Sequence, residues 1–248
     1  MAGHSKWANI KHRKGKADAA KGKIFTRVAK EIINAVKLGG PDAKMNPRLR
    51  LALQKAKAAN VPNDNIERCI KKASSNDQEA YHEMHYELYG YGGVGIIAEI
   101  MTDNKNRIAS DIRIATNKCG GTIAHPGSVV FNFDHKGIIR VSKHQALEDE
   151  LFLAVSEAGA EDFEAEDEDF VIVTDPTDFD KVKEAITALG VEKMDANLEF
   201  VPKTYIDCNQ ETAKLNIALL EWLDGIDDVD TVYHNMKIPE ELANNDED

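Results

Sequence analysis

Two similar halves make up the stretch GIIRVSKHQALEDELFLAVSEAGAEDFEAEDEDFVIVTDPTDFDKVKEAITALGVEKMDANLEFV (137–201). Its hydrophobic pattern predicts strands at 137–141, 160–164, 170–174 and 191–201, with helices at 144–158 and 178–189. Both helices end in a matching step, AGAE at 158–161 and LGVE at 189–192. A β-α-β-β-α-β order of this kind predicts a ferredoxin-like domain.

Shorter strands and helices on either side of this stretch predict a discontinuous α/β domain. Before it, we expect strands at 85–89, 95–101 and 128–133 and a helix at 105–118. After it, a strand at 205–207, a helix at 212–223 and a strand at 230–234 are expected to complete the same domain. The ferredoxin-like domain (135–203) is thus inserted between residues 80–134 and 204–239. The end, 240–248, is acidic and rich in Asn, which is typical of a disordered tail.

Three amphipathic helices are predicted in residues 1–77. The first covers 16–38 and ends at Gly39 and Gly40, the second opens at Asn46 and Pro47 and ends near residue 60, and the third covers 62–73. Short connections between such helices indicate a small bundle. The predicted fold class is therefore α+β, with a helical bundle, a discontinuous α/β domain and an inserted ferredoxin-like domain.

Charge is distributed unevenly along the 248 residues. The first 73 residues contain 18 Lys and Arg against 5 Asp and Glu, whereas the remainder contains 13 against 38. Because like charges at this density repel one another, such a segment is typical of a chain with an oppositely charged partner. For a lysine-rich helical segment, the phosphate backbone of a nucleic acid is the best match.

The cations of the first helix are expected to form a stripe opposite its apolar face, and the basic residues before it to form an arm. Lysine predominates, which favours phosphate contacts over base reading. A solvated face and a membrane-surface helix are the alternatives for the stripe. Trp7 stacks on bases or packs against the bundle, two readings that the sequence leaves open. The predicted phosphate contacts are Lys6, Lys11, Arg13, Lys14, Lys16, Lys21, Lys23, Arg27 and Lys30.

A second polar segment, TDNKNR (102–107), joins a strand end to a helix start. Free amides and the helix dipole can hold an anion at such a place. Capping of the helix by Asp103 or Asn104 is the simpler alternative. The segment is predicted to make a secondary contact with RNA or protein through Asn104, Lys105 and Arg107.

Other motifs point away from catalysis and cofactors. Gly90, Gly92 and Gly95 fit the dinucleotide fingerprint, but a strand is expected to follow them where that motif needs a helix. His82 and His85 would lie on opposite faces of a strand, so no metal site is predicted. No nucleophile motif appears, and no small-molecule substrate is expected. Three widely spaced cysteines and the lack of a signal peptide or membrane span favour the cytoplasm.

Four segments resemble the YebC/PmpR family across essentially the whole chain. They are MAGHSKWANIKHRKGKADAAKGKIF (1–25), VPNDNIERCIKKA (61–73), YGYGGVGIIAE (89–99) and TDNKNR (102–107). The resemblance implies the same three-domain organisation. It also implies a function in gene expression, since bacterial members are assigned as DNA-binding transcriptional regulators and the mitochondrial relative is a translational activator of cytochrome c oxidase.

The expected function is a non-enzymatic, nucleic-acid-binding regulator of gene expression. DNA binding in transcription regulation is the family assignment. The alternative is RNA binding in translation regulation. In that case the chain would be a ribosome-associated factor that relieves stalling on proline-rich stretches. A protein-interaction scaffold, in which the acidic domains dominate, is the alternative of a different class.

Overall fold

The computed structural model describes residues 17–75, 80–239 and 242. It combines helices with mainly antiparallel sheets, so the predicted α+β class is confirmed. Residue contacts divide the chain into two compact units. In the described part, the smaller unit is 130–205, and the larger comprises 17–75, 80–129, 206–239 and 242. The separation of the larger unit into a bundle and an α/β domain stays a prediction.

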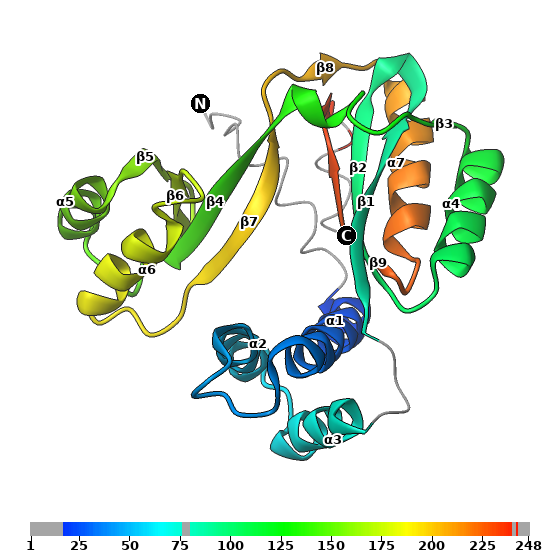
Figure 1. Cartoon of the computed structure of the whole chain (residues 1–248). Helices are drawn as coiled ribbons and strands as arrows, with labels where there is room; N and C mark the ends of the chain where they lie inside the picture. The colour runs from blue at the N-terminus through cyan, green and yellow to red at the C-terminus, as the bar shows by residue number, and fades with distance from the viewer. Residues whose placement is uncertain (1–16, 76–79, 240–241, 243–248) are drawn as a thin grey trace. The chain divides into compact units, whose positions relative to one another are not determined.

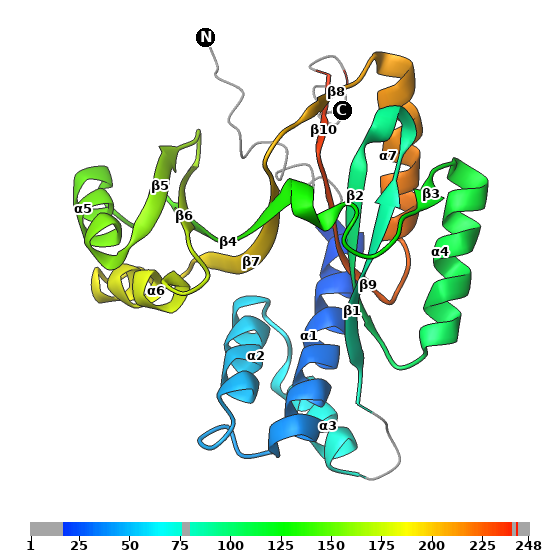
Figure 2. The ribbon, with the colours of Figure 1, turned by 45° about the horizontal axis from the view of Figure 1, so that its top comes forward.

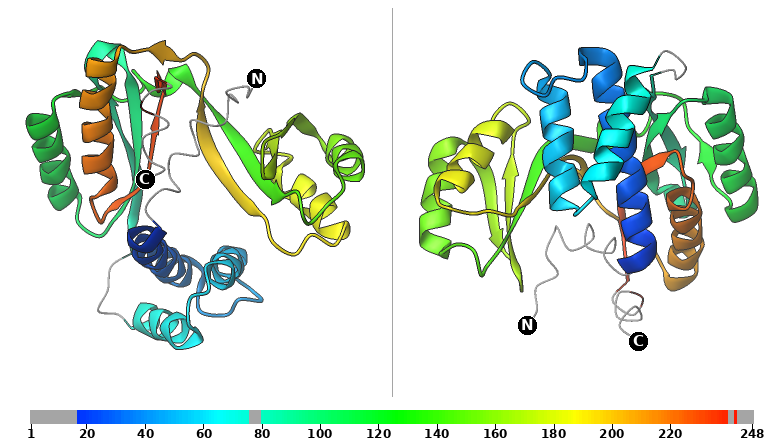
Figure 3. Two further views of the ribbon diagram at one scale, coloured as in Figure 1. Left: turned by 180° about the vertical axis from the view of Figure 1, so that it is seen from behind. Right: turned by 90° about the horizontal axis from the view of Figure 1, so that it is seen from below.

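Three helices form the bundle of the larger unit (Figure 3). They are α1 (Ala17–Gly39), α2 (Pro47–Ala58) and α3 (Asn63–Ser74), close to the predicted bounds. Asn46 explains the start of α2, because its side chain accepts a hydrogen bond of 3.0 Å from the amide of Leu49. The core is made of small and medium apolar side chains, chiefly Val28, Ile32, Val36, Leu49, Ala52 and Ile66.

A four-stranded sheet with the order β3-β1-β2-β9 forms the centre of the larger unit (Figure 1). Its strands are β1 (His82–Tyr89), β2 (Gly95–Thr102), β3 (Thr122–Ile123) and β9 (Val229–His234). The pairing of β9 with β2 confirms that the C-terminal segment returns to this sheet. The helices α4 (Lys105–Cys119) and α7 (Gln210–Asp224) cover one face of it, and two short strands, β8 (Ile206–Asp207) and β10 (Met236–Lys237), pair separately.

The connection between β1 and β2 is held by a buried asparagine of α7. This connection is the short helix η2 (Tyr91–Gly93), and a strand follows it, as predicted. The side chain of Asn216 accepts a hydrogen bond of 2.8 Å from the amide of Tyr91 and donates one of 3.1 Å to its carbonyl. A Cβ added at Gly90 would lie 2.4 Å from Asn216 Oδ1. The glycine is therefore required by close packing against α7.

The smaller unit has the predicted β-α-β-β-α-β order, preceded by the short helix η3 (Val130–Asn132). Its elements are β4 (Phe133–Ser142), α5 (Glu148–Ala158), β5 (Ala160–Ala165), β6 (Asp169–Thr174), α6 (Phe179–Ala188) and β7 (Asp195–Pro202). The sheet order is β5-β6-β4-β7, with antiparallel neighbours throughout. Figure 2 shows both helices on one face of this sheet, where Leu151, Val155, Val182 and Ile186 meet Ile139 and Ile172.

The strand predicted at 128–133 is wrong. Residues 126–129 form turns, η3 follows, and the strand begins only at Phe133 and continues through the predicted 137–141. Side chains bind the backbone of this segment in place of a neighbouring strand. Glu87 accepts hydrogen bonds from the amides of Gly127 and Val129, and the hydroxyl of Tyr89 donates to the carbonyl of Ser128.

Two element starts in the smaller unit also lie later than predicted. Helix α5 begins at Glu148 and not at 144, and β7 begins at Asp195 and not at 191. Gln145 accounts for both late starts. Its backbone amide donates a hydrogen bond to the carbonyl of Ser142, and its side-chain amide donates one to the carbonyl of Lys193. The tail predicted at 240–248 lies outside the described residues except for Leu242. Within the described parts, no helix has the length and apolar character that a membrane crossing requires.

We expect Gly90→Ala to lower the free energy of unfolding by about 1–3 kcal/mol, because its methyl group would overlap Asn216. Gly22→Ala is the matched control. Gly22 lies in α1 with nothing within 4 Å of an added Cβ, so this variant should be unchanged or up to about 1 kcal/mol more stable. Urea unfolding measures both. Equal stabilities of the two variants would contradict the close contact at Gly90.

Candidate nucleic-acid interface

Most of the predicted phosphate contacts lie where the structure gives no side-chain detail. Lys21 and Lys23 belong to α1, but their side chains are outside the described part. The residues outside the described range altogether are Lys6, Trp7, Lys11, Arg13, Lys14 and Lys16. The structure therefore informs the roles of Arg27, Lys30 and the segment 102–107.

Lys30 is buried between α1 and the central sheet. Only 7% of the residue is exposed. Its ammonium donates hydrogen bonds to the carbonyl oxygens of Met101 and Asp227, at 3.0 and 2.6 Å, and to Asp228 Oδ1 at 3.2 Å. All three donor hydrogens of the ammonium thus have acceptors inside the fold. In this conformation Lys30 holds α1 to the sheet and does not present its charge to solvent.

Arg27 also faces the sheet. Its guanidinium donates a hydrogen bond of 3.1 Å to the hydroxyl of Thr231 and lies 3.9 Å from Asp230 and 3.5 Å from Glu31. Two turns further along α1, Asn34 donates to Glu83 at 2.8 Å, and Arg48 of α2 pairs with the same carboxylate. The predicted cationic stripe of α1 is therefore neutralised at Lys30 by Asp228, and at Arg27 by Glu31 of the same helix and Asp230 of β9.

The segment 102–107 holds an anion, and that anion belongs to the protein. Thr102 donates to Asp228 Oδ2 at 2.9 Å, and Arg107 donates to the same oxygen from Nε at 2.9 Å and from Nη2 at 2.6 Å. Asn104 caps α4 by accepting hydrogen bonds from the amides of residues 106 and 107. Lys105 is exposed. The structure thus gives Asn104 the capping role and gives Arg107 an internal partner.

Two neighbouring carboxylates of β9 and its start have opposite pKa shifts. Burial favours a raised pKa for Asp228, but hydrogen bonds from Arg107, Thr102 and Lys30 outweigh it and hold the pKa below the usual range. Among the described residues, no side chain donates a comparable hydrogen bond to Asp230. Burial raises its pKa to about 6, and the opposing charges of Arg27 and Lys30 do not compensate. The fold therefore stabilises the charged form of Asp228 and destabilises the charged form of Asp230.

Within the described part of the bundle, the cations that are exposed to solvent lie on α2, α3 and the turn before α2. Helix α2 contains no acidic residue, and the acids of α3 are Asp64 and Glu67. Within the described residues, six exposed basic side chains of this region form no ion pair; they are Lys44, Arg50, Lys57, Arg68, Lys71 and Lys72. This set is the candidate nucleic-acid interface, and we call it the α2–α3 basic surface.

Sequence reasoning gave this surface too little weight. The periodicity of α3 already predicts that Arg68, Lys71 and Lys72 point outward, as the structure confirms. Because lysines are dense before residue 38, the phosphate contacts were predicted in the arm and in α1. The signal for α2 was its lack of acids, which leaves Arg50 and Lys57, seven residues apart, on one exposed side of the helix.

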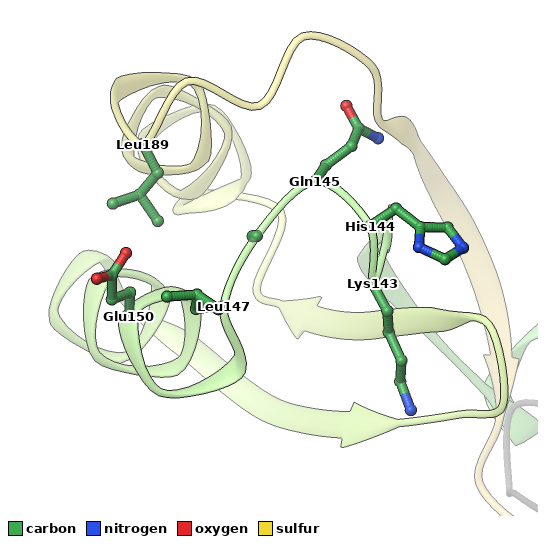
Figure 4. Close-up of a pocket in the computed structure, with 7 residues that line it drawn as sticks. Lys143, His144, Gln145, Leu147, Glu150 and Leu189 are labelled. Carbon is green, nitrogen blue, oxygen red and sulfur yellow. The ribbon is translucent and has the colours of Figure 1, made fainter.

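A shallow surface hollow lies in the smaller unit, far along the chain from these residues. It measures about 270 Å³ and lies between the β4–α5 connection and the end of α6 (Figure 4). Lys143, Leu147, Glu150 and Leu189 are among the residues that line it. Of the predicted nucleic-acid contacts that the structure describes, none lines it. Among the described residues, no group of three or more potential ligand side chains is placed to hold a metal ion.

The chain is a mixed helix-and-sheet protein that combines a basic helical bundle, an acidic α/β part and a β-α-β-β-α-β unit. Its sequence also matches a known family. Residues 5–76 match the N-terminal domain of the TACO1/YebC protein, and residues 81–236 match the second and third domains. The chain belongs to the TACO1/YebC family, which confirms the resemblance in the sequence.

Relatives span nearly the whole chain. A probable transcriptional regulatory protein of Protochlamydia amoebophila is 69% identical over 244 residues, which cover 98% of this chain and 100% of the relative. One from Chlamydia trachomatis serovar L2 is 59% identical, over 95% of this chain and 100% of the relative. The crystal structure of a conserved hypothetical protein from Aquifex aeolicus has a TM-score of 0.83 and 41% identity, covering 95% of this chain and 98% of that one.

We expect Asp230→Asn to be more stable than the natural chain at pH 7, by about 1–2 kcal/mol. The folded chain carries Asp230 charged at pH 7 although its pKa is raised from 3.8 to about 6, so the natural chain loses stability as the pH rises through 6. The difference between the two proteins should therefore shrink between pH 7 and pH 4. Urea unfolding at several pH values measures it. A less stable variant at pH 7 would show that pairing with Arg27 dominates.

Proposed function

We propose that this chain is a non-enzymatic regulator of gene expression that binds nucleic acid, DNA in the first instance, through its N-terminal bundle. The names of the relatives support a role in transcription regulation. The observation that carries the proposal is the α2–α3 basic surface, whose side chains are exposed and have no ion-pair partners in the described structure. Unneutralised cations at this density attract a polyanion.

Compensation of the helix dipole, a common structural role of basic residues, explains only some of these cations. Lys57 lies in the last turn of α2, and Lys71 and Lys72 lie in the last turn of α3, where they offset the helix dipole. Arg50 and Arg68 lie in the body of their helices and Lys44 lies before α2, so the dipole does not account for them. These three charges favour an external anion.

The basic arm adds to this interface in the proposal. Lys6, Lys11, Arg13, Lys14, Lys16, Lys21 and Lys23 would contact phosphates, with Trp7 stacking on a base or sugar. Lys30 is left out of the phosphate contacts because its ammonium is buried, and Arg27 is left out because it pairs inside the fold. Contacts of this type read the backbone more than the base sequence. Their chemistry suits structured ribosomal RNA as well as duplex DNA.

The proposed place of action is the cytoplasm, with neither a cofactor nor a small-molecule substrate. The cysteines that support this are Cys69, Cys119 and Cys208, which are unpaired. A chain that acts on DNA or on ribosomes would meet both there. The acidic smaller unit is proposed to serve interactions other than nucleic-acid binding.

Replacing four members of the α2–α3 basic surface by glutamine should weaken binding to duplex DNA and flatten its salt dependence. The variant combines Arg50→Gln, Lys57→Gln, Arg68→Gln and Lys72→Gln. If each side chain contacts one phosphate, the slope of log K against log salt should fall by about 3–4. Fluorescence anisotropy between 50 and 200 mM salt measures it.

The control for this experiment removes the same charge elsewhere, with Arg113→Gln, Lys118→Gln, Lys193→Gln and Lys214→Gln. These exposed cations lie outside the bundle, so the slope should stay unchanged. An equal fall of the slope in both variants would show that net charge, and not the α2–α3 basic surface, determines the binding. A parallel titration with a ribosomal RNA hairpin decides between targets, since tighter binding to the RNA would move the role from transcription to translation.

Removing residues 1–16 should reduce affinity for DNA further and lower the salt slope, because five Lys and Arg are lost. The same anisotropy titration measures the change, with unfolding by urea as a check that the remaining chain folds. An unchanged affinity would favour the scaffold alternative, in which the basic segment binds acidic protein surfaces.

A further inference from the structure

Asp228 lies at the point where three elements of the larger unit meet. Its side chain is 4% exposed. The donors around it come from α1 (Lys30), from the end of β2 (Thr102) and from the first turn of α4 (Arg107). Its backbone also takes part, because its carbonyl accepts a hydrogen bond of 3.0 Å from the amide of Met101.

These donors have the chemistry of a phosphate site. An ammonium, a hydroxyl and a guanidinium converge on one pair of oxygens at a helix start, which is how proteins hold an external anion. Oδ2 receives the hydroxyl and two guanidinium hydrogens, and Oδ1 receives the ammonium. Asp103 binds Nη2 of Arg107 at 2.7 Å and so orients the guanidinium.

We propose that Asp228 is a built-in anion that fastens the N-terminal bundle to the α/β sheet, occupying the position that a phosphate would take between Lys30, Thr102 and Arg107. Two cations that the sequence assigns to nucleic acid are committed to this carboxylate. The link therefore fixes the orientation of α1 on the sheet, and with it the orientation of the α2–α3 basic surface. This inference goes beyond the proposed function and does not depend on it.

Lys30 shows why the link is specific to this carboxylate. Two of its three acceptors are carbonyl oxygens, of Met101 and Asp227, which cannot neutralise its charge. Asp228 is the acidic side chain within hydrogen-bond distance of the ammonium in the described structure. Without it, the buried ammonium of Lys30 would have no carboxylate beside it and Arg107 would keep only Asp103, and a buried charge left without its partner is strongly destabilising.

Chemical rescue of an Asp228→Ala variant of the full chain tests the proposal. The variant removes the carboxylate and leaves room for a small anion among its former donors. Its Tm should fall by roughly 10 °C, as expected when one member of a buried ion pair is lost. Sodium formate should then raise the Tm by several degrees more than sodium chloride at the same concentration. The natural chain and Asp227→Ala, an exposed neighbour, should show no such difference.

Asp228→Asn serves where the alanine variant does not fold, because the amide keeps one oxygen acceptor and loses the charge. Hydrogen exchange should be faster in α1 and at the start of α4, and unchanged in α5 and α6 of the smaller unit. Equal effects of formate and chloride would overturn the proposal, as would unchanged exchange in α1. Because no nucleic acid is present in either experiment, these outcomes are independent of the DNA titrations above.

Discussion

A lysine ammonium buried against a sheet needs a negative charge beside it, and Asp228 supplies that charge to Lys30. Much of the larger unit is arranged around this requirement. β2 ends at Thr102, whose hydroxyl reaches the carboxylate, α4 has Arg107 in its first turn, and β9 starts directly after Asp228. Three elements, each more than a hundred residues before Asp228 in sequence, thus share its pair of oxygens.

The same region shows how donor count, and not proximity of charge alone, decides whether a buried carboxylate is stabilised. Asp228 receives hydrogen bonds from three side chains, and its pKa is held low although burial acts in the opposite direction. Asp230 has Arg27 within 3.9 Å, and its pKa is nevertheless raised to about 6. A guanidinium at that distance attracts the charge but does not replace the water that the carboxylate lost. The larger unit therefore contains one acid that stabilises its fold and one that weakens it at neutral pH.

Regular elements were largely predictable from the sequence, and tertiary partners were not. Periodicity and caps such as Asn46 placed α2 and α3 within a few residues, because these signals are local. The strand expected at 128–133 failed because Glu87 and Tyr89, some forty residues earlier, bind that backbone. For the candidate site, the bundle was identified correctly as the basic region, but Lys30 could not be assigned. Helical spacing puts it opposite the apolar face, and only the fold reveals that an acidic sheet end covers that side.

The smaller unit enters and leaves the chain through neighbouring strands, since Phe133 of β4 is paired with Pro202 of β7. Once this unit has formed, the two ends of the segment that interrupts the central sheet are already side by side. The strand β9 then pairs with β2 across roughly 50 intervening residues instead of roughly 125, because residues 130–205 are already folded as one unit. In loop-closure terms this early pairing spares the chain about 0.8 kcal/mol of entropy. The folded insertion thus keeps the connection between the two distant parts of its host short.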